Sequence, residues 1–183
     1  MSEFVFRECT VNDAAMMIAH MCAVGGETDF LTYSADTFNI SERKEASFIS
    51  RFERSPRDVI YIAQDTESGE ITGVGIVECA RGERLSHNAE ISLTVLRKHW
   101  GKGIGSRLME MMIAFAKANG THALTLFARA DNNRALTLYE KYGFQRTGRT
   151  PDFFKIGDSY YDAVTMYLAL SARGLEIEST ELY

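Results

Sequence analysis

The sequence predicts a mixed α/β fold in which one β-sheet and several helices form a single domain. Segments in which apolar residues alternate with a period of two are interleaved with segments in which they recur about every 3.6 residues, the patterns of strands and helices. A length of 183 residues is typical of one domain. The apolar share of 45% and the charged share of 25% are those of a globular protein, so a disordered or fibrous chain is excluded.

The chain opens with a predicted strand over 4–9, which is followed by a helix. Thr10, with Asp13 three residues later, is a capping signal for this helix. We expect the helix to run to about Val24 and the Gly25-Gly26 pair to end it.

Residues 27–40 are expected to be irregular, after which the pattern becomes helical again. Ser41 is a good N-cap for an amphipathic helix that ends near Pro56. Two strands, 59–63 and 71–78, are joined by a tight turn and form a predicted hairpin.

In the second half of the chain strands alternate with helices. A strand over 89–95 precedes a helix that begins near Gly103, carries one apolar stripe and ends at Asn119-Gly120. The remaining predicted elements are a strand at 123–127, a helix at 131–142 closed by Gly143, and two extended segments that begin at Phe144 and finish over 160–170. We assign 1–170 to the domain and 171–183 to a C-terminal tail or docked appendage.

The charge and the apolar patterning exclude several classes of protein. The formal net charge is −5, which argues against a nucleic-acid partner because phosphate neutralisation requires clustered lysine and arginine. The first residues show no basic segment followed by an apolar run, so no secretory signal is expected. No apolar stretch approaches the roughly 20 residues that span a bilayer. We therefore expect a cytoplasmic protein without a membrane partner, and the sequence leaves a homodimer open.

Three cysteines, Cys9, Cys22 and Cys79, lie far apart in the sequence. Their number and spacing match neither a disulfide framework nor a zinc site. Each is expected to be a small buried apolar residue, and no metal is expected.

A glycine-rich turn stands where a predicted strand passes into a helix, and it reads Trp-Gly-Lys-Gly-Ile-Gly-Ser over 100–106. Its three glycines permit backbone angles closed to other residues and leave no side chain in front of the amide groups. Several N–H groups can then converge at a helix N-terminus, where the helix dipole favours an anion. The pattern indicates a pyrophosphate-binding turn, and a flexible turn without a ligand is the alternative.

Two nucleotide-binding patterns do not match this turn. A P-loop needs Gly-Lys followed by Ser or Thr, and here Lys102 is followed by Gly103. A dinucleotide fingerprint that starts at Gly101 requires a glycine where the chain has Ser106. One that starts at Gly103 requires Gly or Ala where the chain has Leu108.

The turn and the strand before it resemble the GNAT superfamily of acyl-CoA-dependent N-acetyltransferases. In that family a strand of the form Glu-x-x-x-x-Val precedes a pyrophosphate loop that reads Arg or Gln, x, x, Gly, x, then Gly or Ala. Here the strand runs from Glu90 to Val95 and the loop from Trp100 to Gly105. Trp100 departs from the family at the Arg or Gln position, which removes a polar side chain near the phosphates but leaves the amides.

A second motif carries the same resemblance. Residues 132–144 read Asn-Asn-Arg-Ala-Leu-Thr-Leu-Tyr-Glu-Lys-Tyr-Gly-Phe and are similar to the family's Asn-x-x-Ala-x-x-Leu-Tyr-x-x-x-Gly-Phe. Residues 154–162, with Met166 following, resemble the terminal hairpin of many members. The resemblance covers about 4–170 and implies a GNAT-type single mixed, mostly antiparallel sheet flanked by helices on both faces.

The resemblance also implies that the acetyl group of acetyl-CoA moves directly onto a primary amine. Glu90 would be the general base, directly or through water, and Tyr139 the general acid that protonates the departing thiolate. On the residues alone, Glu90 could be a solvated strand residue and Tyr139 part of a packed helical face. The implied cofactor-binding residues are Val95, Trp100, Gly101, Lys102, Gly103, Ile104, Gly105, Ser106 and Asn132, of which Asn132 is also expected to cap its helix.

The acceptor pocket is implied to lie near the first two helices and the terminal hairpin. Its candidate residues are Glu27, Thr28, Asp29, Tyr33, Phe154 and Tyr160. The acceptor would be an amine-bearing small molecule or a peptide, so an enzyme for protein N-termini stays open beside a small-molecule enzyme. The alternative from another class is a CoA-binding sensor or interaction domain that has kept the fold without catalysis.

Overall fold

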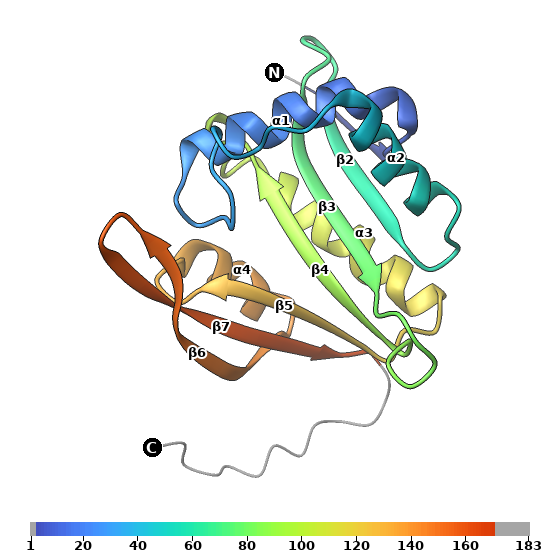
Figure 1. Cartoon of the computed structure of the whole chain (residues 1–183). Helices are drawn as coiled ribbons and strands as arrows, with labels where there is room; N and C mark the ends of the chain where they lie inside the picture. The colour runs from blue at the N-terminus through green and yellow to red at the C-terminus, as the bar shows by residue number, and fades with distance from the viewer. Residues whose placement is uncertain (1–2, 171–183) are drawn as a thin grey trace.

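The computed structural model describes residues 3–170, and its elements follow the predicted order (Figure 1). The strands are β1 (Phe4–Glu8), β2 (Val59–Asp65), β3 (Ile71–Cys79), β4 (Asn88–Val95), β5 (Ala123–Arg129), β6 (Gln145–Ile156) and β7 (Ser159–Ala169). The helices are α1 (Ala14–Glu27), α2 (Glu42–Glu53), α3 (Ile104–Ala118) and α4 (Asn133–Lys141), with short 3-10 turns η1 (Val11–Asp13) and η2 (Arg97–His99). The expected tail over 171–183 lies outside the described residues.

The strands form one seven-stranded sheet in the order β1-β2-β3-β4-β5-β7-β6. β4 and β5 are parallel neighbours, and all other neighbouring strands in this sheet are antiparallel. The prediction of a single mixed, mostly antiparallel sheet is therefore confirmed.

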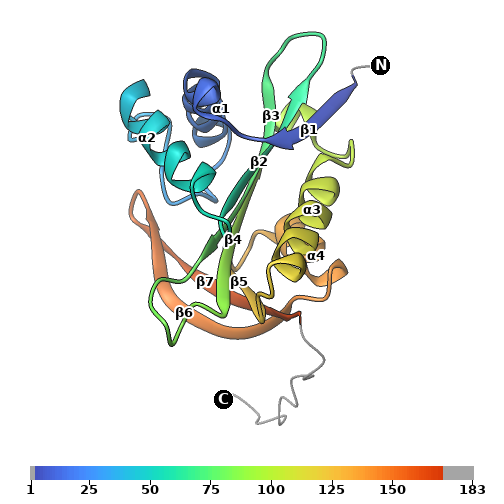
Figure 2. The same cartoon turned by 90° about the vertical axis from the view of Figure 1, so that its right-hand side faces the viewer.

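Helices cover both faces of the sheet, with α1 and α2 on one face and α3 and α4 on the other (Figure 2). We call these the α1–α2 face and the α3–α4 face. The core of the α1–α2 face includes Met17, Ile49, Phe52, Ile60, Ile62 and Val74. The core of the α3–α4 face includes Met109, Met112, Leu124, Leu126, Leu136 and Met166. None of the helices within 3–170 is long and apolar enough to cross a membrane.

The prediction that the Gly25-Gly26 pair ends the first helix is wrong, because α1 continues to Glu27. The chain after the helix folds back against it, so that a Cβ on Gly25 would lie 2.9 Å from the backbone nitrogen of Ala35 and 3.0 Å from the backbone carbon of Ser34. The glycine is thus required by the close approach of a second backbone, and the helix continues through it.

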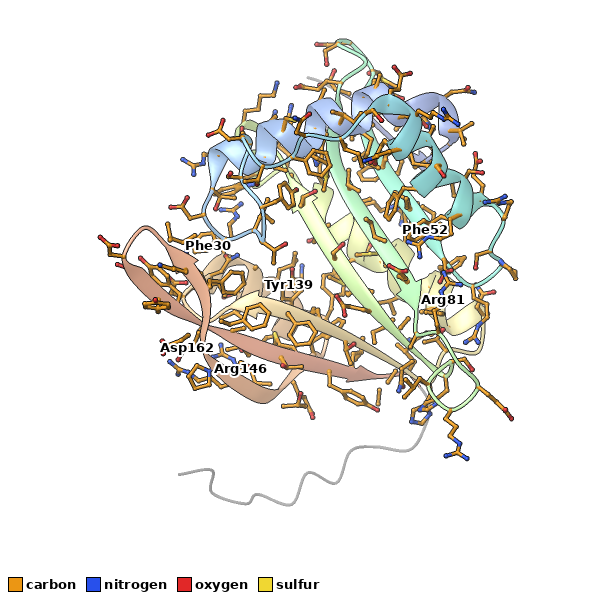
Figure 3. The ribbon with its side chains drawn as sticks, viewed as in Figure 1. Phe30, Phe52, Arg81, Tyr139, Arg146 and Asp162 are labelled. Atoms are coloured by element: carbon orange, nitrogen blue, oxygen red, sulfur yellow. The ribbon has the colours of Figure 1, made fainter. Side chains whose placement is uncertain are left out.

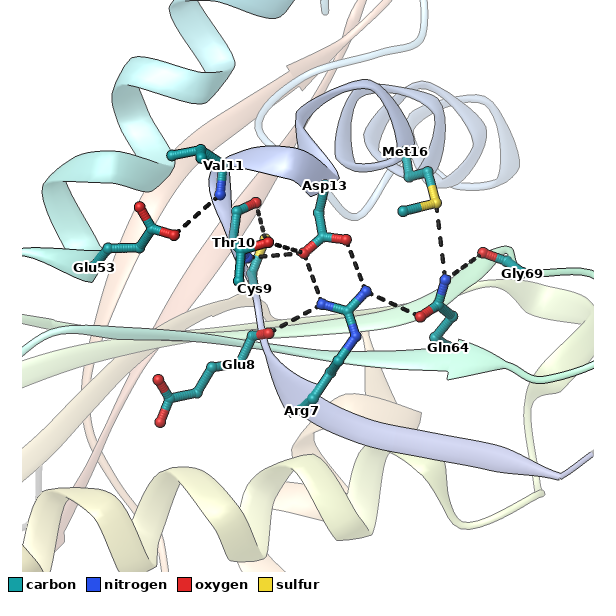
Figure 4. Close-up of polar contacts among 10 residues, drawn as sticks. All are labelled: Arg7, Glu8, Cys9, Thr10, Val11, Asp13, Met16, Glu53, Gln64 and Gly69. Atoms are coloured by element: carbon teal, nitrogen blue, oxygen red, sulfur yellow. Dashed lines mark hydrogen bonds and ion pairs between the residues drawn. The ribbon is translucent and has the colours of Figure 1, made fainter.

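Arg7 ties β1 to η1 and β2 (Figure 4). Its two terminal nitrogens donate to the two carboxylate oxygens of Asp13, each at 2.7 Å, and one of them also donates to Gln64 Oε1 at 3.0 Å. Asp13 accepts from the backbone N–H of Thr10 at 2.8 Å, which confirms the predicted capping signal. The Arg7 guanidinium holds the pKa of the buried Asp13 carboxyl below its ordinary value.

The cysteines form no disulfide with one another. Cys9 and Cys79 are buried, as predicted, whereas Cys22 is half-buried. Burial raises the pKa of the Cys9 thiol to about 12, so this thiol stays protonated and unreactive at neutral pH.

Candidate active site

The sheet opens between β4 and β5. The two strands are paired from Asn88 with Ala123 to Glu90 with Thr125, and beyond this point they diverge (Figure 1). The second half of β4 therefore keeps β3 on one side and has no strand on the other.

Alternate residues of β4 direct their backbone groups into this opening. At one end of the β3–β4 ladder the Asn88 carbonyl accepts from the Ala80 N–H, and at the other end the Leu96 N–H donates to the Thr72 carbonyl. The alternation of an antiparallel ladder then assigns the even-numbered residues of β4 to β3. Leu93 and Val95 consequently turn their N–H and C=O groups toward the opening. The Val95 carbonyl accepts from Trp100 Nε1 at 2.7 Å. The other groups form a short strand edge of the kind that pairs with an extended ligand.

The turn after β4 has the backbone shape of an anion site. Gly101 and Gly103 have φ values of 79° and 83°, in the left-handed region that favours glycine. Gly103 is the N-cap of α3 and offers no side chain to cap the helix, and the first turn of α3 carries no acidic residue. The first intrahelical bond runs from Arg107 N–H to the Gly103 carbonyl, so the amides of 104–106 are available to a ligand.

Glu90 projects from β4 on the α1–α2 face, since its neighbours Ala89 and Ile91 pack in the core of the opposite face. Glu78 lies directly across on β3 and accepts from Arg51 Nη1 at 2.7 Å. Loss of hydration, with repulsion from Glu78 as the second cause, raises the pKa of the Glu90 carboxyl. An open cavity of about 410 Å³ lies here, and its lining includes Phe48, Glu78, Asn88, Glu90, Ser92 and Thr125.

Tyr139 lies on α4, on the α3–α4 face of the sheet (Figure 3). It is 7% exposed, and its ring packs against Phe144 with the centroids 6.1 Å apart. Among the described residues its hydroxyl has no hydrogen-bond partner, and the oxygen is not among the fully buried atoms that lack one, so it keeps some contact with solvent. Burial raises the pKa of Tyr139 to about 12, so the phenol keeps its proton across the neutral range.

Residues 28–144 match a family model described as the acetyltransferase (GNAT) family, a span that contains the glycine turn, Glu90 and Tyr139. The chain belongs to the GNAT acetyltransferase family.

Solved structures share the fold of this GNAT chain. A GNAT-family acetyltransferase from Streptococcus pneumoniae has a TM-score of 0.87 at 26% identity, over 92% of this chain and 100% of that chain. An N-acetyltransferase from Staphylococcus aureus Mu50 has a TM-score of 0.81 at 21% identity, over 93% and 100% of the two chains. The Salmonella typhimurium protein yncA, solved with its cofactor acetyl-CoA, has a TM-score of 0.80 at 19% identity, over 92% and 95%. No curated protein matches this chain.

Trp100, the departure from the GNAT pattern, holds two arginines beside the turn. The guanidinium carbon of Arg134 lies 4.5 Å from the centroid of the Trp100 ring system, and that of Arg97 lies 5.5 Å from it. α4 therefore supplies an exposed positive charge next to the turn from which the polar side chain is missing. Neither arginine is among the predicted cofactor residues. The sequence signal for Arg134 was its place in the 132–144 motif. Its contact with Trp100 could not be predicted from the sequence, because the two residues lie in segments that are distant along the chain.

The other predicted cofactor residues of this GNAT chain lie in the turn, in the first turn of α3 and at the start of α4. Lys102 Nζ lies 3.2 Å from His99 Nδ1 and so folds back toward η2. The Ile104 side chain is buried in the core, so this residue can offer a ligand its amide alone. The Ser106 carbonyl accepts from the Tyr142 hydroxyl at 3.1 Å. The Asn132 side chain accepts from the Ala135 N–H at 3.2 Å, which confirms that it caps α4.

Gly105 lies in the first turn of α3 with an ordinary helical φ. A Cβ there would lie 3.4 Å from Leu138 Cδ2 and 3.7 Å from Leu93 Cδ2, which is ordinary contact. The fold therefore tolerates a small side chain at this position, and the benefit of glycine is to leave the neighbouring amides uncovered.

Three of the predicted acceptor residues line a second cavity of about 410 Å³, namely Glu27, Thr28 and Asp29. Arg129 borders it, and its guanidinium carbon lies 4.3 Å from the ring centroids of both Phe30 and Tyr161. Arg129 also donates to the Asp29 carbonyl at 3.1 Å. The chain after α1 is thereby held against the ends of β5 and β7.

The other three predicted acceptor residues line neither cavity. Tyr33 packs against Phe38, with the ring centroids 5.1 Å apart. Phe154 is buried, and Tyr160 is 57% exposed at the β6–β7 turn. Within 3–170, no three His, Cys, Asp or Glu side chains gather as metal ligands would.

Proposed function

We propose that this chain transfers the acetyl group of acetyl-CoA to a primary amine by direct attack of the amine. The observation that carries the proposal is the opening between β4 and β5, which leads to an uncapped helix N-terminus and has Glu90 on one face of the sheet and Tyr139 on the other. The acetyl-CoA bound by yncA, a protein of the same fold, supports the choice of cofactor.

The cofactor would follow the groups that the opening leaves without partners. Its pyrophosphate would accept from the amides of 104–106, where the helix dipole favours negative charge, with Lys102 and Arg134 nearby. The amide groups of its pantetheine arm would pair with the strand edge at Leu93 and Val95. Acetyl-CoA supplies the thioester carbonyl that the amine attacks.

The two faces separate the two proton transfers that the reaction needs. An alkyl ammonium has a pKa of about 10.4, so the attacking amine must lose a proton, which Glu90 takes directly or through water on the α1–α2 face. The carbon–nitrogen bond forms and the carbon–sulfur bond breaks. Tyr139 donates its proton to the departing thiolate on the α3–α4 face, and the nitrogen of the new amide loses its second proton to solvent. Solvent then restores the proton of Tyr139.

The test is the substitution Tyr139→Phe, which keeps the ring and removes the proton. We expect turnover, measured as thiol release from acetyl-CoA with a panel of amines, to fall by roughly 10²–10⁴. Because the hydroxyl has no hydrogen-bond partner among the described residues, we expect the melting temperature and the Kd for acetyl-CoA to change little.

Two outcomes would contradict the proposal. Near-normal turnover in a destabilised Tyr139→Phe variant would make Tyr139 a core residue with a satisfied hydroxyl, worth about 1 kcal/mol. Tight binding of acetyl-CoA by the wild type without thiol release for any amine would favour a CoA-binding sensor.

A further inference from the structure

Two phenylalanine rings are exposed on the α1–α2 face beside the opening. Phe127 is 49% exposed and Phe153 is 50% exposed. Their ring planes are parallel within 3°, with the centroids 6.4 Å apart, so they form one stacked apolar surface. Single exposed apolar side chains are common on proteins, whereas a stacked pair beside a candidate active site is a candidate ligand-binding surface.

The position of Phe127 follows from the strand register. Thr125 is the last residue of β5 that pairs with β4, and its partner is Glu90. Phe127 comes two residues later, so it lies on the same face as Glu90, at the point where the strands begin to diverge. Leu126 between them points into the opposite core, which confirms this alternation.

Phe153 reaches Phe127 because β6 carries a bulge. Between Thr150 and Phe154 the three residues 151–153 face the single residue Asp162 on β7. Asp152 has a φ of 53° and is the one non-glycine residue with a positive φ in the described part of the chain. Such strained backbone often marks a functional position, and here it turns Phe153 toward β5.

Asp162, which lies on β7 (Figure 3), holds this bulge by two hydrogen bonds. One of its carboxylate oxygens accepts from the Asp152 N–H at 3.0 Å, and the other accepts from Arg149 Nε at 2.6 Å. These two bonds lower the pKa of the Asp162 carboxyl, so the clamp is fully charged at neutral pH. Phe154, which is buried, supports the Phe153 ring edge-on at 5.1 Å between centroids. Phe153 is therefore presented in one orientation.

We propose that Phe127 and Phe153 form a platform that binds the aromatic ring of an arylalkylamine acceptor. The proposal rests on the proposed function, because it assigns the part of the acceptor that lies beyond the reacting amine. The Glu90 carboxylate attracts the ammonium end, and the two rings offer flat apolar area to the other end. Asp162 is the positioning residue of this platform.

The experiment compares two amines, phenethylamine and putrescine, a diamine without a ring. We expect the wild type to acetylate phenethylamine with at least tenfold higher kcat/KM. Phe153→Ala should lower kcat/KM for phenethylamine about tenfold, equivalent to about 1.4 kcal/mol, through a higher KM. Its kcat/KM for putrescine and its Kd for acetyl-CoA should stay unchanged.

Two further variants separate positioning from general damage. Asp162→Ala should raise the KM for phenethylamine as Phe153→Ala does, because the bulge loses its clamp, and the KM for putrescine should stay unchanged. Leu85→Ala removes an equally exposed apolar side chain, 58% exposed on the β3–β4 loop, and should change neither KM.

The outcomes distinguish this proposal from the proposed function. If the wild type acetylates putrescine as well as phenethylamine, or if Phe153→Ala affects both amines equally, the platform is refuted and the acetyltransferase stands. If neither amine nor any other releases thiol, the proposed function fails and the platform fails with it.

Discussion

Glu90 and Tyr139 owe their proposed roles to different surroundings. The Glu90 carboxyl faces Glu78 across β3 and β4, and its raised pKa makes it a stronger base. The Tyr139 phenol is buried, and its raised pKa keeps the proton in place until an acceptor such as a thiolate is beside it. The same direction of shift strengthens Glu90 as a base, whereas it keeps Tyr139 protonated and makes it a weaker acid.

Glu90→Gln should produce a defect that is largest near neutral pH. There most of the amine is protonated, because its pKa is about 10, and we expect turnover to fall roughly 10²-fold. As pH rises, free amine accumulates and the variant approaches the wild type. As pH falls through the raised pKa of Glu90, the wild-type carboxyl is protonated and the difference narrows again. A pH–rate profile of both proteins checks this.

Glu78→Gln is the matched comparison, since it removes the facing charge and leaves the base in place. The pKa of Glu90 should fall toward its ordinary value, so the acid limb of the profile should move to lower pH while the base still functions. Profiles of identical shape for wild type and Glu90→Gln would remove Glu90 from the mechanism.

At the scale of elements, α3 follows the glycine turn and links β4 to β5, the two strands that border the opening. Gly103 begins the helix and Gly120 follows its C-cap Asn119, and the two glycines have φ values of 83° and 67°. A Cβ at either position would meet no atom within 4 Å, so substitution costs backbone strain without a clash. The two ends of one helix therefore provide a matched pair of variants.

Gly103→Ala and Gly120→Ala should each destabilise the fold by about 1–2 kcal/mol, the cost of an L-residue in the left-handed region. Only Gly103→Ala should weaken acetyl-CoA binding, by at least tenfold or about 1.4 kcal/mol, because its backbone strain falls at the N-terminus of α3, where the free amides lie. Calorimetric titration and urea unfolding of both proteins measure the two effects. Equal affinities in the two folded variants would show that the turn does not hold the cofactor.

At the scale of the whole molecule, the two cores leave one face of the opening accessible. The core of the α3–α4 face takes residues from β3, β4, β5 and β7 and so holds both sides of the opening together. The core of the α1–α2 face lies over β2 and β3. On that face the opening is therefore bordered by polar and aromatic side chains such as Glu90 and Phe127.

Asp13→Asn tests the clamp between β1 and the rest of the molecule. We expect it to lower the free energy of unfolding at pH 7 by about 2 kcal/mol, since two charge-assisted hydrogen bonds from Arg7 are lost. The folded-state pKa of Asp13 lies below its ordinary value of 3.8. The wild type should therefore keep its full excess of unfolding free energy over the variant at pH values above 3.8. It should lose this excess as pH falls through the lowered pKa of Asp13. Urea unfolding between neutral and acid pH measures both.

Asp36 provides the control, because it is exposed and lies outside the contact between Arg7 and Asp13. Asp36→Asn should leave the free energy of unfolding at pH 7 unchanged. If Asp13→Asn behaved like Asp36→Asn, the Arg7 contacts would contribute nothing to stability.

The order of the elements, the capping residues and the two GNAT motifs could be predicted from the sequence. Each of these depends on residues that lie close together in the chain, as with Thr10 and Asp13 at the start of α1 or the left-handed glycines of the turn. Local spacing specifies such features because hydrogen bonds and backbone preferences act over a few residues. The one local pattern that misled, Gly25-Gly26, reflects a contact with a later segment, Ser34 and Ala35.

The surroundings of the candidate site were decided by the tertiary structure alone. The divergence of β4 and β5, the contact of Arg134 with Trp100 and the stacking of Phe153 on Phe127 all join segments far apart in the chain. A period of two tells which residues of a strand share a face, but the register between strands decides which side chains of two strands meet. The bulge in β6 shows the consequence, because it exposes Phe153, whereas Phe154, a predicted acceptor residue, is buried.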